Sequence, residues 1–222
     1  MLLSIDTCGP LGTVALARLD NEKLSLLAQT ELPGKTYSAR LIPAIRELLA
    51  VHSVTLAEIA TIVVTNGPGS FTGIRIGLST AKGLAEPSSI PILAVSRLAV
   101  LAHKAGATAA ALDASRKEFY CGDYSTAIPS ESLLSRDVFA QNATALGSQL
   151  AISEATLATE APKATRVDPP TALDAIHFAL PRLRARDFDD PLLLDGNYLR
   201  RSDAEIFSGP GAPPRPQPTR HA

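Results

Sequence analysis

The strongest constraint on the fold is a glycine-rich turn that joins an apolar run to an amphipathic segment. The apolar run 61–65 predicts a buried strand, and residues 72–85 predict a helix. The Gly-Pro-Gly at 67–69 between them is typical of a tight turn. Ser70 or Thr72 can then cap the helix. The sequence therefore predicts a strand, a sharp turn and a helix in direct succession.

The same turn invites a dinucleotide-binding interpretation. Gly67, Gly69 and Gly73 follow a strand and open a helix, where backbone amides could hold a pyrophosphate. However, the preceding strand is about the fourth element of the chain, whereas this motif belongs to the first strand of a βαβ unit. The only acid near the required spacing is Glu86, which precedes Pro87 at a helix end. Both observations argue against a dinucleotide-binding oxidoreductase.

Two glycines give the predicted helix a face of small residues. Gly73 and Gly77 lie four residues apart, and Ala81 and Leu84 continue the face. A helical glycine costs about 1 kcal/mol relative to alanine, so two on one face indicate a demand for close packing. The demand can come from inside the domain or from a partner protein.

The remaining pattern indicates an α/β protein with mixed sheets flanked by helices. Three strands expected at 1–5, 13–19 and 24–32 predict antiparallel hairpins, and a helix over 36–51 carries an apolar stripe. The further expected elements are strands at 91–95, 108–113, 118–124 and 192–194, a helix at 172–183, and a helix capped by Ser96. Residues 128–168 are weakly patterned. We expect an N-terminal lobe over 1–105, a smaller lobe over 106–208, and a disordered proline-rich tail over 209–222.

Composition restricts the function. Lys and Arg number 21 and Asp and Glu number 22, so the net charge is −1 and the chain lacks the basic excess of a protein that grips nucleic acid unaided. Cys8 and Cys121 lie far apart and are expected to be free thiols. An acid, Asp6, follows only five residues, so no signal peptide fits and a cytoplasmic location is expected. The four histidines form no HxxxH pair, and no metal site is predicted.

Six segments match, in the same order, segments of one bacterial protein family. They are residues 2–7 (LLSIDT), 37–43 (YSARLIP), 66–85 (NGPGSFTGIRIGLSTAKGLA), 90–96 (IPILAVS), 112–120 (LDASRKEFY) and 198–200 (YLR). On these segments the chain resembles the TsaB (YeaZ) family, although that family often has histidine where this chain has Tyr37. The resemblance is specific over residues 1–124 and thin over 125–190.

The resemblance implies an actin-like ATPase or RNase H-like (ASKHA) fold with two related lobes. In active members of that superfamily, an aspartate after the first strand helps to bind metal and nucleotide, and glycines and threonines cradle phosphate. Asp6, Thr7, Gly9 and Gly12 stand in that place here. Because TsaB-like proteins have a degraded site, we expect Asp6 to cap a turn instead. Asp6, Thr7 and Gly9 remain weak cofactor-binding candidates, and no cofactor is predicted.

The resemblance also implies a role as a non-catalytic subunit. Such a subunit docks on and activates the catalytic subunit TsaD, which places threonylcarbamoyl on adenosine 37 of tRNAs that read ANN codons. The ATPase TsaE joins a larger assembly, tRNA is bound only indirectly, and the subunit alone forms a homodimer. The expected interface lies on the helices at 36–51 and 72–85, at Leu41, Ile45, Leu48, Gly73, Ile74, Gly77 and Ala81. The alternative is a nucleotide-dependent enzyme, a kinase or ATPase, of the same fold.

Overall fold

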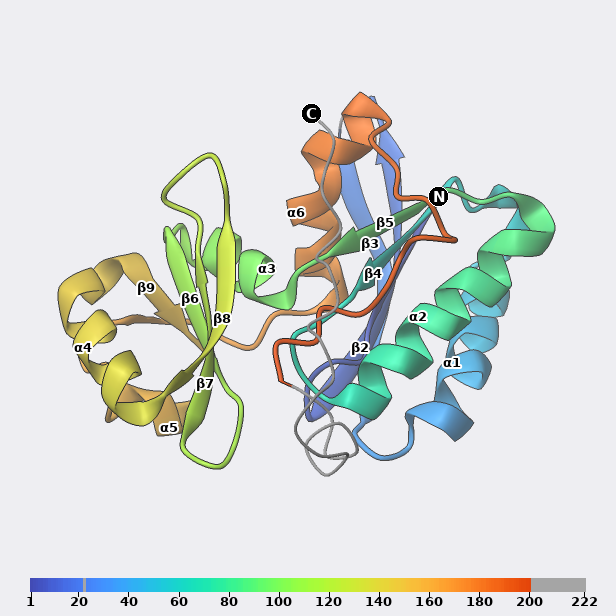
Figure 1. Cartoon of the computed structure of the whole chain (residues 1–222). Coiled ribbons are helices and arrows are strands. Elements are labelled where there is room, and N and C mark those ends of the chain that lie inside the picture. Colours follow the sequence, from blue (N-terminus) through green and yellow to red (C-terminus); the bar gives the residue numbers. More distant parts are fainter. Residues whose placement is uncertain (22, 201–222) are drawn as a thin grey trace.

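A computed structural model describes residues 1–21 and 23–200, which form two lobes joined side by side (Figure 1). Each lobe is built on a five-stranded mixed sheet. This is the α/β architecture, with mixed sheets flanked by helices, that the sequence predicts. The predicted proline-rich tail at 209–222 lies outside the described residues.

The first sheet combines a hairpin meander with two parallel strands. Its strands are β1 (Leu2–Asp6), β2 (Leu11–Asp20), β3 (Lys23–Pro33), β4 (Thr61–Thr65) and β5 (Ile92–Val95). Their spatial order is β3-β2-β1-β4-β5, in which β2 and β3 are antiparallel neighbours and β4 and β5 run parallel to β1. Strands β1 and β4 are buried on both faces, which explains their mostly apolar sequence.

Helices cover both faces of the first sheet. On one face, α1 (Tyr37–Val51) and α2 (Phe71–Ala85) lie side by side and pack on alternate residues of β1 and β2. On the other face, α3 (Arg97–Ala105) and α6 (Ala172–Ala185) pack on the remaining alternate residues. The predicted caps form, since Ser70 accepts from the Gly73 amide and Ser96 accepts from the Ala99 amide. Short 3₁₀ turns occur at Leu56–Glu58, Glu86–Ser88 and Gly147–Gln149.

The second sheet is also covered by helices on both faces. Its strands are β6 (Ala109–Asp113), β7 (Glu118–Asp123), β8 (Ser130–Ser135), β9 (Leu150–Ile152) and β10 (Thr165–Arg166), in the order β10-β9-β6-β7-β8. Helices α4 (Arg136–Leu146) and α5 (Ala155–Ala158) cover one face. The other face packs on α3, whose apolar residues therefore contact both sheets. Helix α3 is the shared layer between the lobes.

Two predictions of the C-terminal part are wrong. The predicted second lobe at 106–208 included the helix at 172–183, but α6 packs on the first sheet through Ala172, Ala175, Ile176 and Ala179. The amphipathic face alone could not say which sheet it would cover. The strand predicted at 192–194 is a turn instead.

The last described segment, residues 189–200, binds both lobes, and we call it the C-terminal strap. It starts with a bridge between Asp189 and Ile92 at the edge of the first sheet. Tyr198 then packs against the first core, while Leu199 packs against the core shared by α3 and the second sheet. The strap therefore ties the lobes together on the side that α3 does not cover.

No helix in the described part of the chain has both the length and the apolar character needed to cross a membrane.

The packing of α6 gives a stability prediction. Ile176→Ala removes a fully buried side chain from the first lobe's core and should lower the free energy of unfolding by about 2–5 kcal/mol. Leu192→Ala, at a side chain that is 91% exposed, should change it by less than about 0.5 kcal/mol. Chemical denaturation of both variants checks this expectation, and equal effects would contradict the placement of α6.

Candidate functional site: the cleft between the lobes

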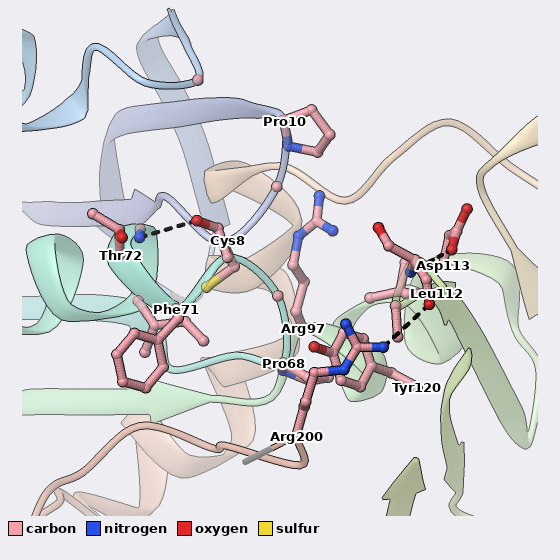
Figure 2. Close-up of a pocket in the computed structure, with 18 of the residues that line it drawn as sticks. Cys8, Pro10, Pro68, Phe71, Thr72, Arg97, Leu112, Asp113, Tyr120 and Arg200 are labelled. Atoms are coloured by element: carbon pink, nitrogen blue, oxygen red, sulfur yellow. Dashed lines mark hydrogen bonds between the residues drawn. The ribbon is translucent and has the colours of Figure 1, made fainter. Parts of the chain in front are cut away.

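A cleft with a volume of about 1340 Å³ lies between the two lobes. One wall is formed by the turn after β1 and by residues 68–74, where α2 begins. The other wall is formed by the turn between β6 and β7 and by Glu154, with the strap closing one side. Figure 2 shows Arg97 between these walls, near Pro10 on one side and Asp113 on the other.

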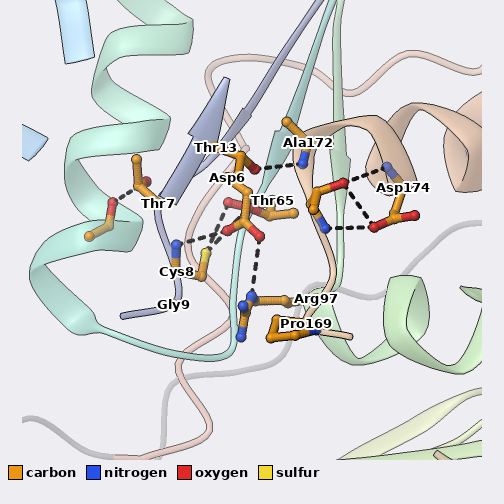
Figure 3. A network of polar contacts seen from close by, with 12 residues as sticks. Asp6, Thr7, Cys8, Gly9, Thr13, Thr65, Arg97, Pro169, Ala172 and Asp174 are labelled. Carbon is orange, nitrogen blue, oxygen red and sulfur yellow. Dashed lines mark hydrogen bonds and ion pairs between the residues drawn. The ribbon is translucent and has the colours of Figure 1, made fainter. Parts of the chain in front are cut away.

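The carboxylate of Asp6 is fully engaged by the protein itself. Its Oδ1 accepts hydrogen bonds from the Cys8 amide at 2.9 Å and from the Thr65 hydroxyl at 2.8 Å. Its Oδ2 pairs with Nε of Arg97 at 3.2 Å (Figure 3). The side chains of Asp6 and Arg97 are only 1% and 5% exposed. Asp6 therefore caps the turn after β1, as expected.

Arg97 keeps its charge in this buried setting. Burial alone lowers the pKa of a guanidinium, but the neighbouring Asp6 carboxylate opposes it, and the net pKa of Arg97 lies above its usual value. For the thiol of Cys8 the effect of burial dominates, and it raises the pKa to about 12. Both cysteines are free, as predicted, and Cys8 is a packed, unreactive side chain.

The small face of α2 is explained by the turn after β1. A Cβ on Gly73 would lie 2.0 Å from the carbonyl oxygen of Thr7, and a Cβ on Gly77 would lie 2.4 Å from the Thr7 hydroxyl. That hydroxyl donates to the Gly73 carbonyl at 2.7 Å. The demand for close packing therefore comes from inside the domain. Thr7, a weak cofactor candidate, is committed to this contact.

The other two glycines of the turn also have packing roles. A Cβ on Gly9 would lie 2.5 Å from Nη2 of Arg97, and a Cβ on Gly12 would lie 2.7 Å from the ring of Tyr37. The Tyr37 hydroxyl donates to the Gly9 carbonyl at 2.7 Å, and burial raises the pKa of Tyr37 to about 12. Gly9 and Gly12 thus leave room for the side chains of Arg97 and Tyr37.

The seven residues predicted at a partner interface do not lie on the surface. All of them are buried in the first lobe: Leu41, Ile45, Leu48, Gly73, Ile74, Gly77 and Ala81. The apolar stripe of α1 and the small face of α2 serve the lobe's own core. The outward faces of the same helices instead expose Ile42, Val51, Arg46 and Arg75.

The far wall of the cleft has an unusual backbone. Ser115, Arg116 and Lys117 have φ of 63°, 56° and 61°, so three consecutive non-glycine residues are left-handed. Such conformations cost energy and cluster at functional sites. The turn is held by Asp113, which accepts from the Ser115 amide at 2.6 Å, and by Arg200, which donates to the Ser115 carbonyl at 3.1 Å.

One carboxylate fixes the lobes relative to each other. Glu131 on β8 of the second lobe accepts hydrogen bonds from Ser96 at the start of α3, from Tyr124 and from Asn197 in the strap. Burial and this carboxylate raise the pKa of Tyr124. The network therefore joins both lobes and the strap at one point beside the cleft.

A smaller groove of about 290 Å³ runs between α2 and the strap. Arg75 lies over the ring of Phe71, with 3.8 Å from Cζ to the ring centroid. The ring of Tyr198 lies 4.9 Å from that of Phe71. This stack fixes an exposed cation on the outer side of α2.

The sequence did not identify Arg97, Glu154 or Arg200 as cleft residues. A signal for Arg97 was present, because it is the single charge in the mostly apolar run 92–102 and a buried cation needs a carboxylate partner. Glu154 and Arg200 lie in segments without a clear pattern, and only the tertiary fold brings them to the cleft.

The comparisons with known proteins point to one family. The family model described as TsaD, tRNA N6-adenosine threonylcarbamoyltransferase, matches residues 27–180. The tRNA threonylcarbamoyladenosine biosynthesis protein TsaB of Bacillus subtilis is 38% identical over 127 residues, which cover 55% of this chain and 54% of the relative. The TsaB of Escherichia coli is 36% identical over 129 residues, with coverages of 55% and 54%. The chain spans about half the length of the curated relatives it matches.

A solved structure extends the similarity to nearly the whole fold. YeaZ from Pseudomonas aeruginosa has 28% sequence identity and a TM-score of 0.71, over 89% of this chain and 99% of that one. A second structure, of an uncharacterised protein with similarity to peptidase YeaZ from the same organism, has the same identity and TM-score over 90% and 99%.

The contact between α2 and Thr7 predicts opposite effects for two Gly→Ala changes in one helix. Gly73→Ala should destabilise the protein by about 1–3 kcal/mol, because the new methyl group meets a backbone oxygen. Gly83→Ala has no heavy atom within 4 Å and should stabilise by up to about 1 kcal/mol through helix propensity. Chemical denaturation measures both, and a neutral Gly73→Ala would contradict the close contact.

The buried ion pair predicts a coupling between its two members. Arg97→Met should destabilise by about 3–5 kcal/mol, because it leaves the Asp6 carboxylate buried without a cation. Adding Asp6→Asn removes that lone charge, so the double variant should lose less than the sum of the two single losses. A double-mutant cycle by denaturation tests this, and simple additivity would show that the pair is not coupled.

Proposed function

The chain belongs to the family of TsaD, tRNA N6-adenosine threonylcarbamoyltransferase, and we propose that it serves this tRNA modification as a non-catalytic partner of a catalytic TsaD subunit. Its curated relatives are named TsaB, threonylcarbamoyladenosine biosynthesis proteins. In the proposed role, docking holds TsaD in a competent conformation while TsaD modifies adenosine 37 of tRNAs that read ANN codons. The ATPase TsaE joins the assembly, and this chain contacts tRNA only indirectly.

The observation that carries the non-catalytic role is the pair between Asp6 and Arg97. The aspartate that would hold a metal and nucleotide in an active relative is neutralised by Arg97 and saturated by the Cys8 amide and the Thr65 hydroxyl. A guanidinium beside that carboxylate also opposes the approach of a divalent cation. These contacts favour a scaffold over the alternative, a nucleotide-dependent kinase or ATPase.

The outward faces of α1 and α2 are the proposed docking surface. The two helices lie side by side on the outer side of the first sheet (Figure 1). Ile42 and Val51 are large apolar side chains on opposite flanks of the buried stripe of α1, and they are 42% and 72% exposed. Arg75 adds an exposed cation held by two aromatic rings, and arginine and aromatic residues are enriched at interface hot spots. This surface replaces the buried residues that the sequence indicated.

Substitutions on the exposed side of α1 test the proposal. Ile42→Glu and Val51→Glu should each weaken binding to the TsaD of the same organism by about 10-fold or more, because each places a charge in an apolar contact. Val138→Glu is the matched control, since Val138 is 44% exposed on α4 of the second lobe. Calorimetry measures affinity, and unchanged binding by both α1 variants would rule out this surface.

Activity completes the test. Threonylcarbamoylation of tRNA should require both TsaD and this chain, and the α1 variants should reduce it in proportion to their loss of binding. Transfer by this chain alone would overturn the non-catalytic role.

Tight binding of ATP with magnesium that Asp6→Ala abolishes would favour the nucleotide-dependent enzyme instead. Ultracentrifugation of the chain alone shows whether the same α1 variants also break a homodimer.

A further inference from the structure

We propose that the cleft binds a small zwitterion, whose anionic group is held by the terminal nitrogens of Arg97 and whose ammonium group is held by Glu154. This ligand site goes beyond the proposed docking role. It lies between the lobes, whereas the docking surface lies on the outward faces of α1 and α2.

Arg97 lines the cleft with hydrogen-bond donors that the described residues leave unused. Only its Nε–H is used, for Asp6 at 3.2 Å. Among residues 1–21 and 23–200, neither terminal nitrogen of Arg97 has a hydrogen-bond acceptor. The side chain is 95% buried, so these donors are largely withdrawn from water yet line the cleft. A guanidinium edge with two free nitrogens matches the two oxygens of a carboxylate.

Gly9 keeps this edge of the guanidinium open. A Cβ at position 9 would lie 2.5 Å from Nη2 of Arg97 and 3.0 Å from its Cζ. The backbone φ of Gly9 is not in the left-handed region, so the turn itself does not require glycine. The space beside the guanidinium does require it.

Glu154 supplies the complementary acceptor. Its Oε2 is buried and has no hydrogen-bond partner in the described part of the chain, although Glu154 lines the same cleft. A buried carboxylate oxygen without a donor is costly. Burial raises the pKa of Glu154, and its own backbone amide, the Ser153 hydroxyl and the charge of Arg97 only partly oppose this rise, so Arg97 acts on the carboxylate from within the same cleft.

The charge balance selects the class of ligand. Asp6 already neutralises Arg97, so a purely anionic ligand would add a charge beside two carboxylates, those of Asp6 and Glu154. A ligand that carries both an anion and an ammonium group adds no net charge and satisfies both free partners. Amino acids are the simplest molecules with this pair of groups.

A series of ω-amino acids tests the site on the full chain. Glycine, β-alanine and γ-aminobutyrate present the same two groups at increasing separation, and acetate presents the carboxylate alone. We expect one member of the series to bind about tenfold or more tighter than acetate, because an added charged hydrogen bond is worth at least that factor. Calorimetry or chemical-shift titration measures the affinities. No member better than acetate would overturn the proposal.

Three variants assign the binding to the named residues. Gly9→Ala displaces the guanidinium, Arg97→Lys keeps the charge and loses the two-pronged edge, and Glu154→Gln removes the charge that holds the ammonium group. Each should reduce binding of the preferred amino acid about tenfold or more, with the fold checked by thermal unfolding. Gly83→Ala, with open space around it, should leave binding unchanged.

The controls keep the outcome decisive. If Gly9→Ala or Arg97→Lys unfolds, Glu154→Gln decides, because it alters neither the ion pair nor the turn after β1. Binding that survives in every folded variant would show attachment elsewhere and would overturn the site. Binding that requires ATP or magnesium would indicate a nucleotide site and would also overturn it. Failure of TsaD docking would leave this result unaffected, because the two readouts are separate.

Discussion

The buried ion pair between Asp6 and Arg97 organises the centre of the molecule. It joins the end of β1 to the first residue of α3, and Thr65 at the end of β4 completes the set. Two charges withdrawn from water stabilise a fold only when their geometry and hydrogen bonds are complete. Here the carboxylate has three partners, and one of them is the permanent cation of Arg97.

The glycines of α2 follow from the same turn. With Asp6 fixed by Arg97, Cys8 lies against Gly69 in the turn before α2, and Thr7 lies against α2 at Gly73 and Gly77, where a side chain would collide with it. Their cost in helix propensity is therefore balanced by contacts within the lobe. Because Gly73 and Gly77 are buried within the lobe, another protein can contact α2 only on its exposed side.

The sequence predicted the elements of the first lobe well because their patterns are local. Turn residues, caps and apolar periodicity located five strands and two long helices within one or two residues of their bounds. It could not decide what each apolar face would contact. The stripe of Leu41, Ile45 and Leu48 is the same whether a partner or the lobe's own sheet covers it, and here the sheet covers it. The position of α6 and the partners of Glu154 depend on long-range packing that no local pattern encodes.

The strap connects the outer surface to the cleft. Tyr198 packs on Phe71 at the start of α2, and the next residues place Leu199 in the second core and Arg200 on the strained turn between β6 and β7. Interiors packed in this way transmit displacements instead of absorbing them. A partner that shifts Arg75 or Phe71 on the outer side of α2 must also repack Tyr198, and the far wall of the cleft moves with it. Residues 198–200 therefore join the proposed docking surface to the proposed ligand site.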